Sequence, residues 1–493
     1  MKRKILAFLV SIACVFSMAF GLVACKESES DADGNGQGEV TLPDKDIGNN
    51  NQNQENGDKN QDGGDESKAP YYDGSPVTIT FFNTMGSALR SVLDSAITRF
   101  NKLYPNVTVE TTGSFTFDSL RDDILTRIPL KTQPNIAFCY ADHVVQYNQS
   151  GAVLPLDGFL PDGAYKNKTV TNTDGTEPLG FTQAQVNDFV GSFLAEGAAF
   201  EDGKLYTLPF AKATDVMYYN KTFFDKYNLT VPTTWTEMEE VCAKIVAIDG
   251  KCTPLACDSE ANLFITLCQQ FGSEYISATG EHYRFDNPKN REFVEMLKRW
   301  SDAGYFATQT TIGGFYTSSL FINKQCYMTI CSAASAKNLL AYGDEFETGV
   351  APIPQANKNN PKTIYQGPSV CIFKKADPKE VAASWLLVKF LTTEARFQAQ
   401  YATYSGYLPV TKSAFNTEGY QEFLAQANLA PEVPARAALV CKQLADSNAF
   451  FTTPAFIGSD KAREQVGNLV VSVLNGTKTV DLAFKDAIAE CKR

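Results

Sequence analysis

The chain has 493 residues, 44 % of them hydrophobic and 20 % charged, which is enough apolar material for two folded cores. Its formal net charge of −12 disfavours nucleic acid as a partner, because no run of lysine and arginine offsets repulsion by phosphate. Only 2 histidines are present, and neither His143 nor His282 has Cys, His or Asp neighbours at metal-ligand spacing. We therefore expect no metal and no cofactor.

The first 25 residues are typical of an exported protein. Basic residues 2–4 precede an apolar stretch, 5–20, that is too short to span a membrane. The run L-V-A-C at 22–25 resembles the lipobox of bacterial lipoproteins, in which the cysteine is diacylated. This resemblance implies a signal peptide over residues 1–24, a lipidated Cys25 and a location on the outer face of the bacterial cytoplasmic membrane. A plain secretory signal is the alternative.

The next segment differs sharply in composition. Gly, Asn, Gln, Asp, Glu and Ser dominate, and few apolar residues are present to repay the entropy of ordering the chain. We expect residues 25–76 to comprise the lipidated cysteine and a disordered tether. The lipid anchor is then the only membrane contact.

Strands and helices alternate from residue 77 onward. We expect strands at 77–82, 107–111 and 136–140, with a helix capped by Ser87 after the first and another over 117–128 after the second. This alternation predicts a parallel sheet covered on both faces. Ligands bind beyond the carboxyl ends of the strands in such sheets, so Asn83, Thr84 and Asp142 are candidate contacts.

Residues 204–220 form the central stretch of the sequence. Two strand-like runs, 205–210 and 216–219, flank a small polar bridge that contains Lys212 and Asp215. Such a bridge can carry the backbone from one sheet to another and leave both side chains facing a cleft. An ordinary hairpin is the alternative. Before this stretch, residues 158–182 have the composition of a surface insertion.

The second half is rich in helices. We expect helices to begin at Thr234 or Thr236, at Pro288 and after Asp377. The three tryptophans, Trp235, Trp300 and Trp385, lie at helix starts or in apolar stripes, which predicts core positions. Aromatic rings available to a binding site must then come from tyrosine and phenylalanine.

Several motifs occur in the order of one known family. The residues L-P-F-A-K-A-T-D-V-M-Y-Y-N-K-T-F-F at 208–224, followed by V-P-T-T-W, resemble the signature of family 1 extracellular solute-binding proteins. These are the ligand-capturing lipoproteins of carbohydrate ABC importers. Further similar stretches are G-A-V-L-P-L-D at 151–157, F-I-N-K-Q-C-Y-M at 321–328, G-V-A-P-I-P at 349–354 and G-Y-L-P at 406–409.

The resemblance implies an α/β, two-lobed, periplasmic-binding-protein-like fold of type II. Each lobe is expected to hold a mixed, mostly parallel sheet flanked by helices, with the ligand cleft between the lobes. Chain crossings are expected at 209–217 and near 348 and 391. The first lobe would comprise residues 77–214 plus 349–391, and the second 215–348 plus 392–493. A monomer of this kind binds a solute, closes on it and is recognised by a permease, without acting as an enzyme.

Short polar side chains, backbone at a helix start and aromatic rings at element ends are the groups that hold a sugar. The candidate substrate-binding residues are Asn83, Thr84, Tyr140, Asp142, Lys212, Asp215, Ser332, Gly367, Tyr407 and Phe456.

The ligand class follows from one branch of the family. Glycerol-3-phosphate-binding members resemble this chain at M-Y-Y-N-K, C-Y-M-T and G-Y-L-P-V-T-K. However, the arginine expected shortly before Gly458 is Phe456, and the expected tyrosine and glutamate align near Thr116 and Ala141. Phosphate needs a guanidinium or an ammonium group, so a neutral sugar or oligosaccharide is favoured.

Other functions remain open at this level. Glycerol-3-phosphate or another anionic solute is one alternative ligand. A secreted glycoside hydrolase would need a pair of carboxylates beside the glycosidic bond, and a surface adhesin or signalling co-receptor could use the same fold. Ten cysteines besides Cys14 and Cys25 are either free buried thiols or, for Cys252 and Cys257, a small disulfide loop.

Overall fold

The computed structural model describes residues 69–493 except 115, 340–344 and 430–431. All of these belong to one compact unit of the chain. The predicted signal peptide, Cys25 and residues 26–68 of the predicted tether lie outside the described residues.

The first sheet contains the strands expected at the start of the folded region. Its strand order is β2-β1-β3-β13-β6, where β1 pairs in parallel with β2 and β3, and β13 pairs antiparallel with β3 and β6. The strand–helix alternation is as predicted, although the cap of the first helix is Gly86 and not Ser87. The bounds are β1 Val77–Asn83, α1 Ser87–Leu103, β2 Val107–Gly113, α2 Phe117–Arg127, β3 Ile136–Cys139, α3 Ala141–Asn148, β6 Thr207–Pro209, β13 Ser369–Ile372 and α11 Pro378–Thr393.

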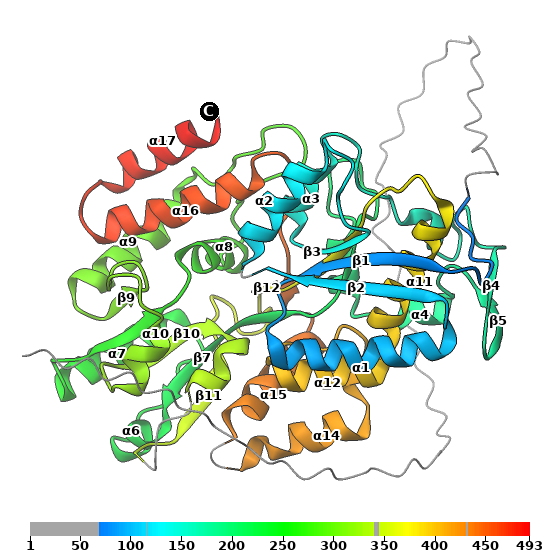
Figure 1. Cartoon of the computed structure of the whole chain (residues 1–493). Helices are drawn as coiled ribbons and strands as arrows, with labels where there is room; N and C mark the ends of the chain where they lie inside the picture. The colour runs from blue at the N-terminus through cyan, green and yellow to red at the C-terminus, as the bar shows by residue number, and fades with distance from the viewer. Residues whose placement is uncertain (1–68, 115, 340–344, 430–431) are drawn as a thin grey trace, which may run out of the picture. The chain divides into compact units, whose positions relative to one another are not determined.

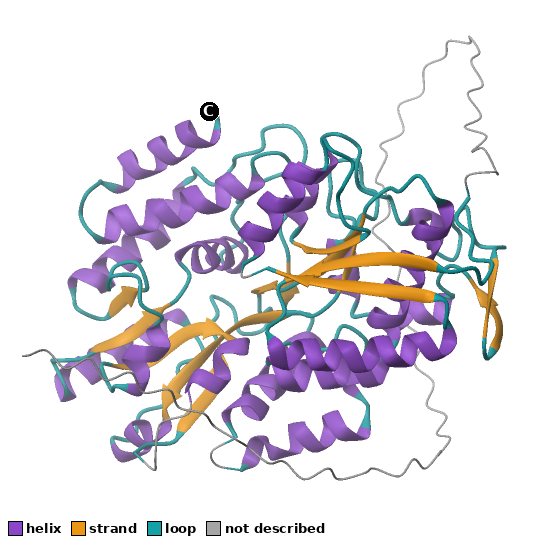
Figure 2. Cartoon of the chain, in the orientation of Figure 1, coloured by secondary structure: helices purple, strands orange, loops and turns teal. Residues whose placement is uncertain are grey.

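The second sheet has the order β14-β12-β7-β10-β8-β9, and β11 also pairs with β7. Its strands are β7 Ala213–Asn220, β8 Thr253–Cys257, β9 Phe306–Thr308, β10 Cys326–Ser332, β11 Thr348–Pro352, β12 Thr363–Gln366 and β14 Phe450–Phe451. Helices flank both sheets, as Figure 2 shows. Both sheets are mixed as predicted, but parallel and antiparallel pairings are balanced in each.

The chain passes from the first sheet to the second between β6 and β7. The two strands belong to different sheets and do not pair, so the hairpin alternative is wrong. The G-Y-L-P stretch lies against this crossing, because Leu408 and Lys212 bridge through their backbones.

The return to the first sheet occurs later than predicted. Strands β11 and β12 both pair with β7, and the next strand, β13, pairs with β3 in the first sheet. The expected crossing near 348 is therefore wrong, since the antiparallel partner of 348–352 is a strand of the second sheet. We place this crossing at Gly367 and Pro368, between β12 and β13.

The predicted crossing near 391 is not a single point in the chain. Helix α12 (Ala395–Ser405) packs on α1 and α11, the helices that lie against the first sheet. Figure 1 shows α1 and α12 side by side. Helix α15 (Val433–Asp446) packs on β7 and β11 instead. The transition to the second lobe is therefore spread over residues 395–446, and the lobe boundaries remain a proposal.

The other elements complete the covering layers. The surface insertion is ordered and contains the hairpin β4 Thr169–Asn172 and β5 Gly175–Pro178. Thr234 caps α7, and Asp377 caps α11 with Pro378 in its first turn, as expected. The remaining helices are α4 Gln183–Asp188, α5 Gly191–Glu196, α6 Lys221–Lys226, α7 Trp235–Ile248, α8 Glu260–Gln270, α9 Pro288–Asp302, α10 Thr317–Ile322, α13 Lys412–Phe415, α14 Glu418–Ala425, α16 Ser459–Leu474 and α17 Val480–Cys491, with 3-10 turns η2 Asp157–Phe159, η3 Ala333–Leu339 and η4 Gln426–Asn428.

The apolar interior contains the tryptophans and most of the cysteines. Trp235, Trp300 and Trp385 are all buried, as predicted. All ten cysteines in the described part are free, and nine of them are buried, so the disulfide alternative for Cys252 and Cys257 is not seen. Within the described ranges, no helix combines the length and apolarity required to cross a membrane.

Candidate ligand-binding cleft

Two adjoining hollows form one continuous cleft between elements of the two sheets. Their volumes are about 830 Å³ and about 470 Å³. Both are lined by Tyr140, Asp258, Ser259, Ile364 and Gln366, which joins them. A space of this size accommodates a small oligosaccharide.

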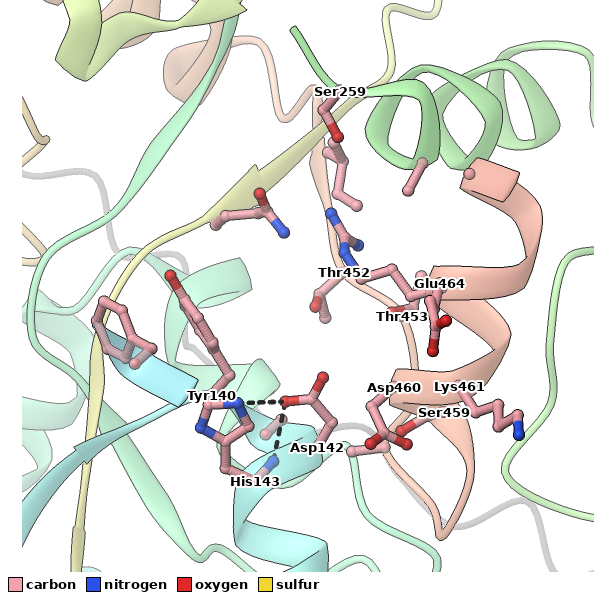
Figure 3. A pocket seen from close by; sticks show the side chains of 18 of the residues that line it. Tyr140, Asp142, His143, Ser259, Thr452, Thr453, Ser459, Asp460, Lys461 and Glu464 are labelled. Atoms are coloured by element: carbon pink, nitrogen blue, oxygen red, sulfur yellow. Dashed lines mark hydrogen bonds and ion pairs between the residues drawn. The ribbon is translucent and has the colours of Figure 1, made fainter. Parts of the chain in front are cut away.

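Helix starts surround the larger hollow. Helix α3 begins directly after Tyr140, α8 after Ser259 and α16 after Gly458, and residues of each first turn line the hollow (Figure 3). The hydroxyl of Ser259 caps α8 by accepting a hydrogen bond from the N–H of Asn262 at 3.1 Å. The first turn of a helix has N–H groups without partners in the helix, so these starts favour ligand oxygen atoms.

Aromatic rings supply the apolar surface of the cleft. Tyr140 lines both hollows and stacks on Phe117, with ring centroids 4.4 Å apart. Tyr407 and Tyr316 line the smaller hollow, and Tyr316 is 66 % exposed. Burial raises the pKa of Tyr140 and Tyr407, so both remain neutral hydroxyl donors. Ring faces of this kind suit the C–H face of a sugar.

The charge of the cleft is strongly negative. Three cationic side chains line the two hollows, against eight carboxylates. The cations are Arg121, Lys461 and Arg463, and the carboxylates are Asp118, Asp142, Glu196, Asp215, Asp258, Glu260, Asp460 and Glu464. This excess disfavours an anionic ligand and suits hydroxyl donors, which bond strongly to ionised acceptors.

Asp215 belongs to a hydrogen-bond network at the floor of the smaller hollow. The side-chain amide of Asn262 donates to the Asp215 carboxylate and to Gln366 Oε1, both at 3.1 Å, and Arg463 donates to Asn262 Oδ1. Burial raises the pKa of Asp215 to about 6, although the bond from Asn262 and the nearby Arg463 both act to lower it. Asp258 lines the same hollow, and burial raises its pKa as well. Its carboxylate accepts two hydrogen bonds from Thr317.

A histidine that sequence reasoning set aside also lines the larger hollow. The Asp142 carboxylate accepts a hydrogen bond from the backbone N–H of His143 at 2.9 Å and lies 3.9 Å from its ring Nε2 (Figure 3). Burial lowers the pKa of His143, so the ring is neutral near pH 7, and its buried Nδ1 has no protein partner. Among the described residues, no group of three or more His, Cys, Asp or Glu is arranged to hold a metal ion.

Comparison with known proteins identifies the family. Residues 95–428 match the model of the bacterial extracellular solute-binding protein family. The chain belongs to this family.

Relatives and solved structures agree with this assignment. The solute-binding protein is 24 % identical over 430 residues to the sn-glycerol-3-phosphate-binding periplasmic protein UgpB of Escherichia coli O1:K1, covering 84 % of this chain and 91 % of the relative. Among solved structures, it resembles the cyclic α-maltosyl-1,6-maltose binding protein from Arthrobacter globiformis, with a TM-score of 0.67 and 19 % identity over 85 % of this chain and 98 % of the other. UgpB from Mycobacterium tuberculosis, solved with glycerophosphocholine, gives a TM-score of 0.66 and 19 % identity over the same shares of the two chains. These structures establish the two-lobed α/β fold.

The cleft contains six of the ten residues predicted to bind the ligand. The six are Tyr140, Asp142, Asp215, Ser332, Gly367 and Tyr407. Ser332 ends β10, and its hydroxyl accepts a hydrogen bond from the N–H of Ala334 at 3.2 Å, at the start of η3 as expected.

Lys212 does not line the cleft and is fully buried. Its ammonium donates to the Glu196 carboxylate, to the Gly367 carbonyl at 3.2 Å and to Ser369 Oγ at 2.9 Å. All three donors of the group are therefore used within the protein. Lys212 was predicted to face the cleft, but these contacts with the Glu196, Gly367 and Ser369 segments hold it inside the protein.

The other three predicted residues lie elsewhere. Asn83 is fully buried at the end of β1, and Thr84 lines a separate hollow beside the start of α1. Phe456 is 1 % exposed and stacks on His282, with centroids 4.3 Å apart. The residues at the end of β1 and the apolar loop at Phe456 thus lie in the protein interior or beside a separate hollow.

Sequence reasoning missed the residues that hold the cleft's polar network. Arg463 lies one turn into α16, after Gly458, where the motif comparison looked for an arginine before that glycine. Asn262 is the last residue of the S-E-A-N run that starts α8, and the Ser259 cap was the signal that could have identified it. Gln366 directly precedes Gly367, which was predicted.

Proposed function

We propose that this solute-binding protein captures a neutral sugar or oligosaccharide in its cleft and delivers it to an ABC importer. The observation that carries the proposal is the lining of the cleft, where eight carboxylates, several amides and hydroxyls, and five tyrosine rings outnumber three cations. Tyrosine rings pack on the apolar face of a sugar, while carboxylates and amides take its hydroxyls.

The action is binding followed by closure, without bond making or breaking. A ligand held by both sides of the cleft shifts the population towards the closed form, which a permease then recognises. The lipobox-like run at 22–25 supports attachment to the outer face of the membrane through Cys25. The folded part acts as a monomer.

Isothermal titration calorimetry of the secreted chain carrying Cys25→Ser tests the ligand class. A panel of neutral mono- and oligosaccharides should include at least one saturable binder, and that sugar should add about 2.7 kcal/mol of stability at 100-fold excess over its Kd. Release of shortened products during incubation would instead indicate a glycoside hydrolase.

Glycerol-3-phosphate is the second candidate, because curated relatives are named for binding it. Arg121, Lys461 and Arg463 are the only cations that line the two described hollows to receive a phosphate. Binding of glycerol-3-phosphate with no response to any neutral sugar would favour this candidate and reject the first.

Two further measurements test delivery and anchoring. Deletion of this chain should abolish uptake of the identified sugar; uptake that survives would favour a co-receptor or adhesin. Mass spectrometry of the membrane-associated protein should find a diacylated Cys25, and Cys25→Ser should release the protein from cells.

A further inference from the structure

A hollow of opposite charge lies away from the cleft. Its volume is about 720 Å³, its wall includes Leu125 and Ile128, and Lys131, Lys374 and Lys375 line it with no Asp or Glu. We call it the basic hollow. In a chain with a net charge of −12, a concave surface with only positive charges is unusual.

The three lysines are not neutralised by the described part of the protein. None of them forms an ion pair with a described carboxylate, whereas nearby Lys379 pairs with Asp73 at 3.5 Å. Lys375 donates only to the backbone carbonyl of Gln133, at 2.6 Å. Burial lowers the pKa of Lys375, although the nearby Glu380 carboxylate acts to raise it.

The basic hollow and the cleft lie at opposite edges of the first sheet. Tyr140 follows the carboxyl end of β3 and lines the cleft, whereas Gln133 precedes the start of β3 and lines the basic hollow. Strand β13 runs antiparallel, with Ile372 opposite Ile136, so Lys374 also lies at the start of β3. The linings of the basic hollow and the cleft share no residue, and Gln146 of the basic hollow donates a hydrogen bond to Asp460 of the cleft.

The chain enters the folded unit at the same edge. Ser75 Oγ accepts a hydrogen bond from Lys379 Nζ at 2.8 Å, and Lys379 lies in the first turn of α11, shortly after Lys374 and Lys375. The stretch that connects the fold to Cys25 therefore joins the fold at the sheet edge that holds the basic hollow.

The lip of the basic hollow carries a strained turn and an exposed apolar residue. The N–H of Thr132 donates to the carbonyl of Arg127, and Lys131 adopts a left-handed conformation with φ 57°. Glycine is preferred at this position after a helix, so a lysine here costs stability. The preceding residue, Leu130, is 72 % exposed. A cationic rim beside an exposed leucine matches a surface with anionic headgroups over an apolar layer.

We propose that the basic hollow docks on the anionic phospholipid headgroups of the membrane that carries the lipid anchor. Lys131 and Lys374 contact the phosphates, and Leu130 enters the interface, so the anchored protein rests with its cleft open to solvent. This inference rests on the proposed anchoring through Cys25. Anchoring holds the protein at the surface, so even a weak contact is populated.

Co-sedimentation with vesicles tests the proposal. The secreted chain with Cys25→Ser is mixed with vesicles of equal parts phosphatidylglycerol and phosphatidylcholine, and with vesicles of phosphatidylcholine alone. We expect binding to the anionic vesicles only, weakened by salt. Lys131→Gly with Lys374→Gln should reduce the partition about 25-fold, since each lysine near an anionic surface contributes roughly fivefold. Lys131→Gly also relieves the strained turn, so loss of folding does not explain the result.

The matched control removes two exposed lysines elsewhere, Lys244→Gln with Lys358→Gln, and should retain binding. Absence of binding to anionic vesicles, or equal losses in both double variants, would overturn the proposal. So would preferential binding of a peptide with the acidic sequence of residues 54–67, which would assign the basic hollow to a protein segment. If the protein binds vesicles but mass spectrometry finds that Cys25 of the native protein is not acylated, the proposed lipid anchor is refuted and the docking surface is not. Sugar binding should be unchanged in both variants, which separates this test from the proposed function.

Discussion

Gln146 on α3 donates a hydrogen bond through Nε2 to Asp460 Oδ2 on α16, at 2.9 Å. Helix α3 follows β3 of the first sheet, while α16 packs on α8 and α9 of the second-sheet side. This bond therefore links the two sides of the cleft, close to the helix starts shown in Figure 3.

We expect Gln146→Ala to shift the protein towards the open form. A hydrogen bond to a charged group at a partly buried site contributes about 1 kcal/mol, so the closed population should fall roughly fivefold. Calorimetry should show a similar rise in Kd, and small-angle scattering a larger radius of gyration. Gln149→Ala, at the exposed end of the same helix, is the matched control. Unchanged affinity and scattering for Gln146→Ala would show that the bond does not set the balance.

Asp215 makes stability depend on pH in an unusual direction. Its pKa is about 6 in the folded protein against 3.8 when unperturbed, so between these values the folded state binds a proton that the unfolded state does not. Stability from this group is therefore gained as pH falls through about 6 and lost as pH rises. Asp215→Asn should stabilise the protein by about 2 kcal/mol near pH 8 and have little effect near pH 4, as measured by urea unfolding.

Ligand binding should show the opposite dependence on pH. A sugar hydroxyl that donates to the ionised Asp215 favours the charged form, so the affinity should fall as pH drops below about 6. Asp215→Asn should remove this pH dependence and weaken binding. A sugar affinity that is flat across this range would indicate that Asp215 does not contact the ligand.

The sequence predicts much of this fold because its signals are local. Alternating strands and helices over 77–140, the Thr234 and Asp377 caps and the buried tryptophans follow from periodicity and capping. The balance of parallel and antiparallel pairs does not, because pairing partners such as β11 and β7 lie more than a hundred residues apart.

A strand end in the sequence places some predicted residues at the cleft but not all of them, since Asn83 ends β1 and is buried. Tyr140 and Asp142 directly follow β3, whose carboxyl end opens on the cleft. Lys212 also has polar neighbours in sequence. In the fold, however, the Glu196 carboxylate and the Ser369 hydroxyl, which belong to other segments, accept hydrogen bonds from its ammonium group. Asn262 and Arg463 are distant in sequence and meet only in the fold. No local pattern reports such pairs.

Lys212→Met should destabilise the protein by about 3 kcal/mol, because the Glu196 carboxylate is left mostly buried without its cation. Lys204→Met, whose partner Asp202 lies 3.8 Å away at the surface, is the control and should change little. Adding Glu196→Gln to Lys212→Met should recover part of the loss in guanidinium unfolding. A variant that keeps full stability but loses sugar affinity would show that Lys212 contacts the ligand after all.

Gly367 should be the least replaceable residue at the return crossing. It has φ 135°, and a Cβ there would lie 2.3 Å from the carbonyl oxygen of Ala211 in the other crossing segment. Gly367→Ala must both strain the backbone and push the two crossing segments apart, which together should cost about 3 kcal/mol. Gly272→Ala separates the two effects, because Gly272 has φ 62° with open space around its Cβ position, and should cost about 1 kcal/mol. Equal losses for the two variants in thermal unfolding would mean that the crossing segments are not in tight contact. Because Gly367 also lines the cleft, the larger loss should be accompanied by weaker sugar binding in calorimetry.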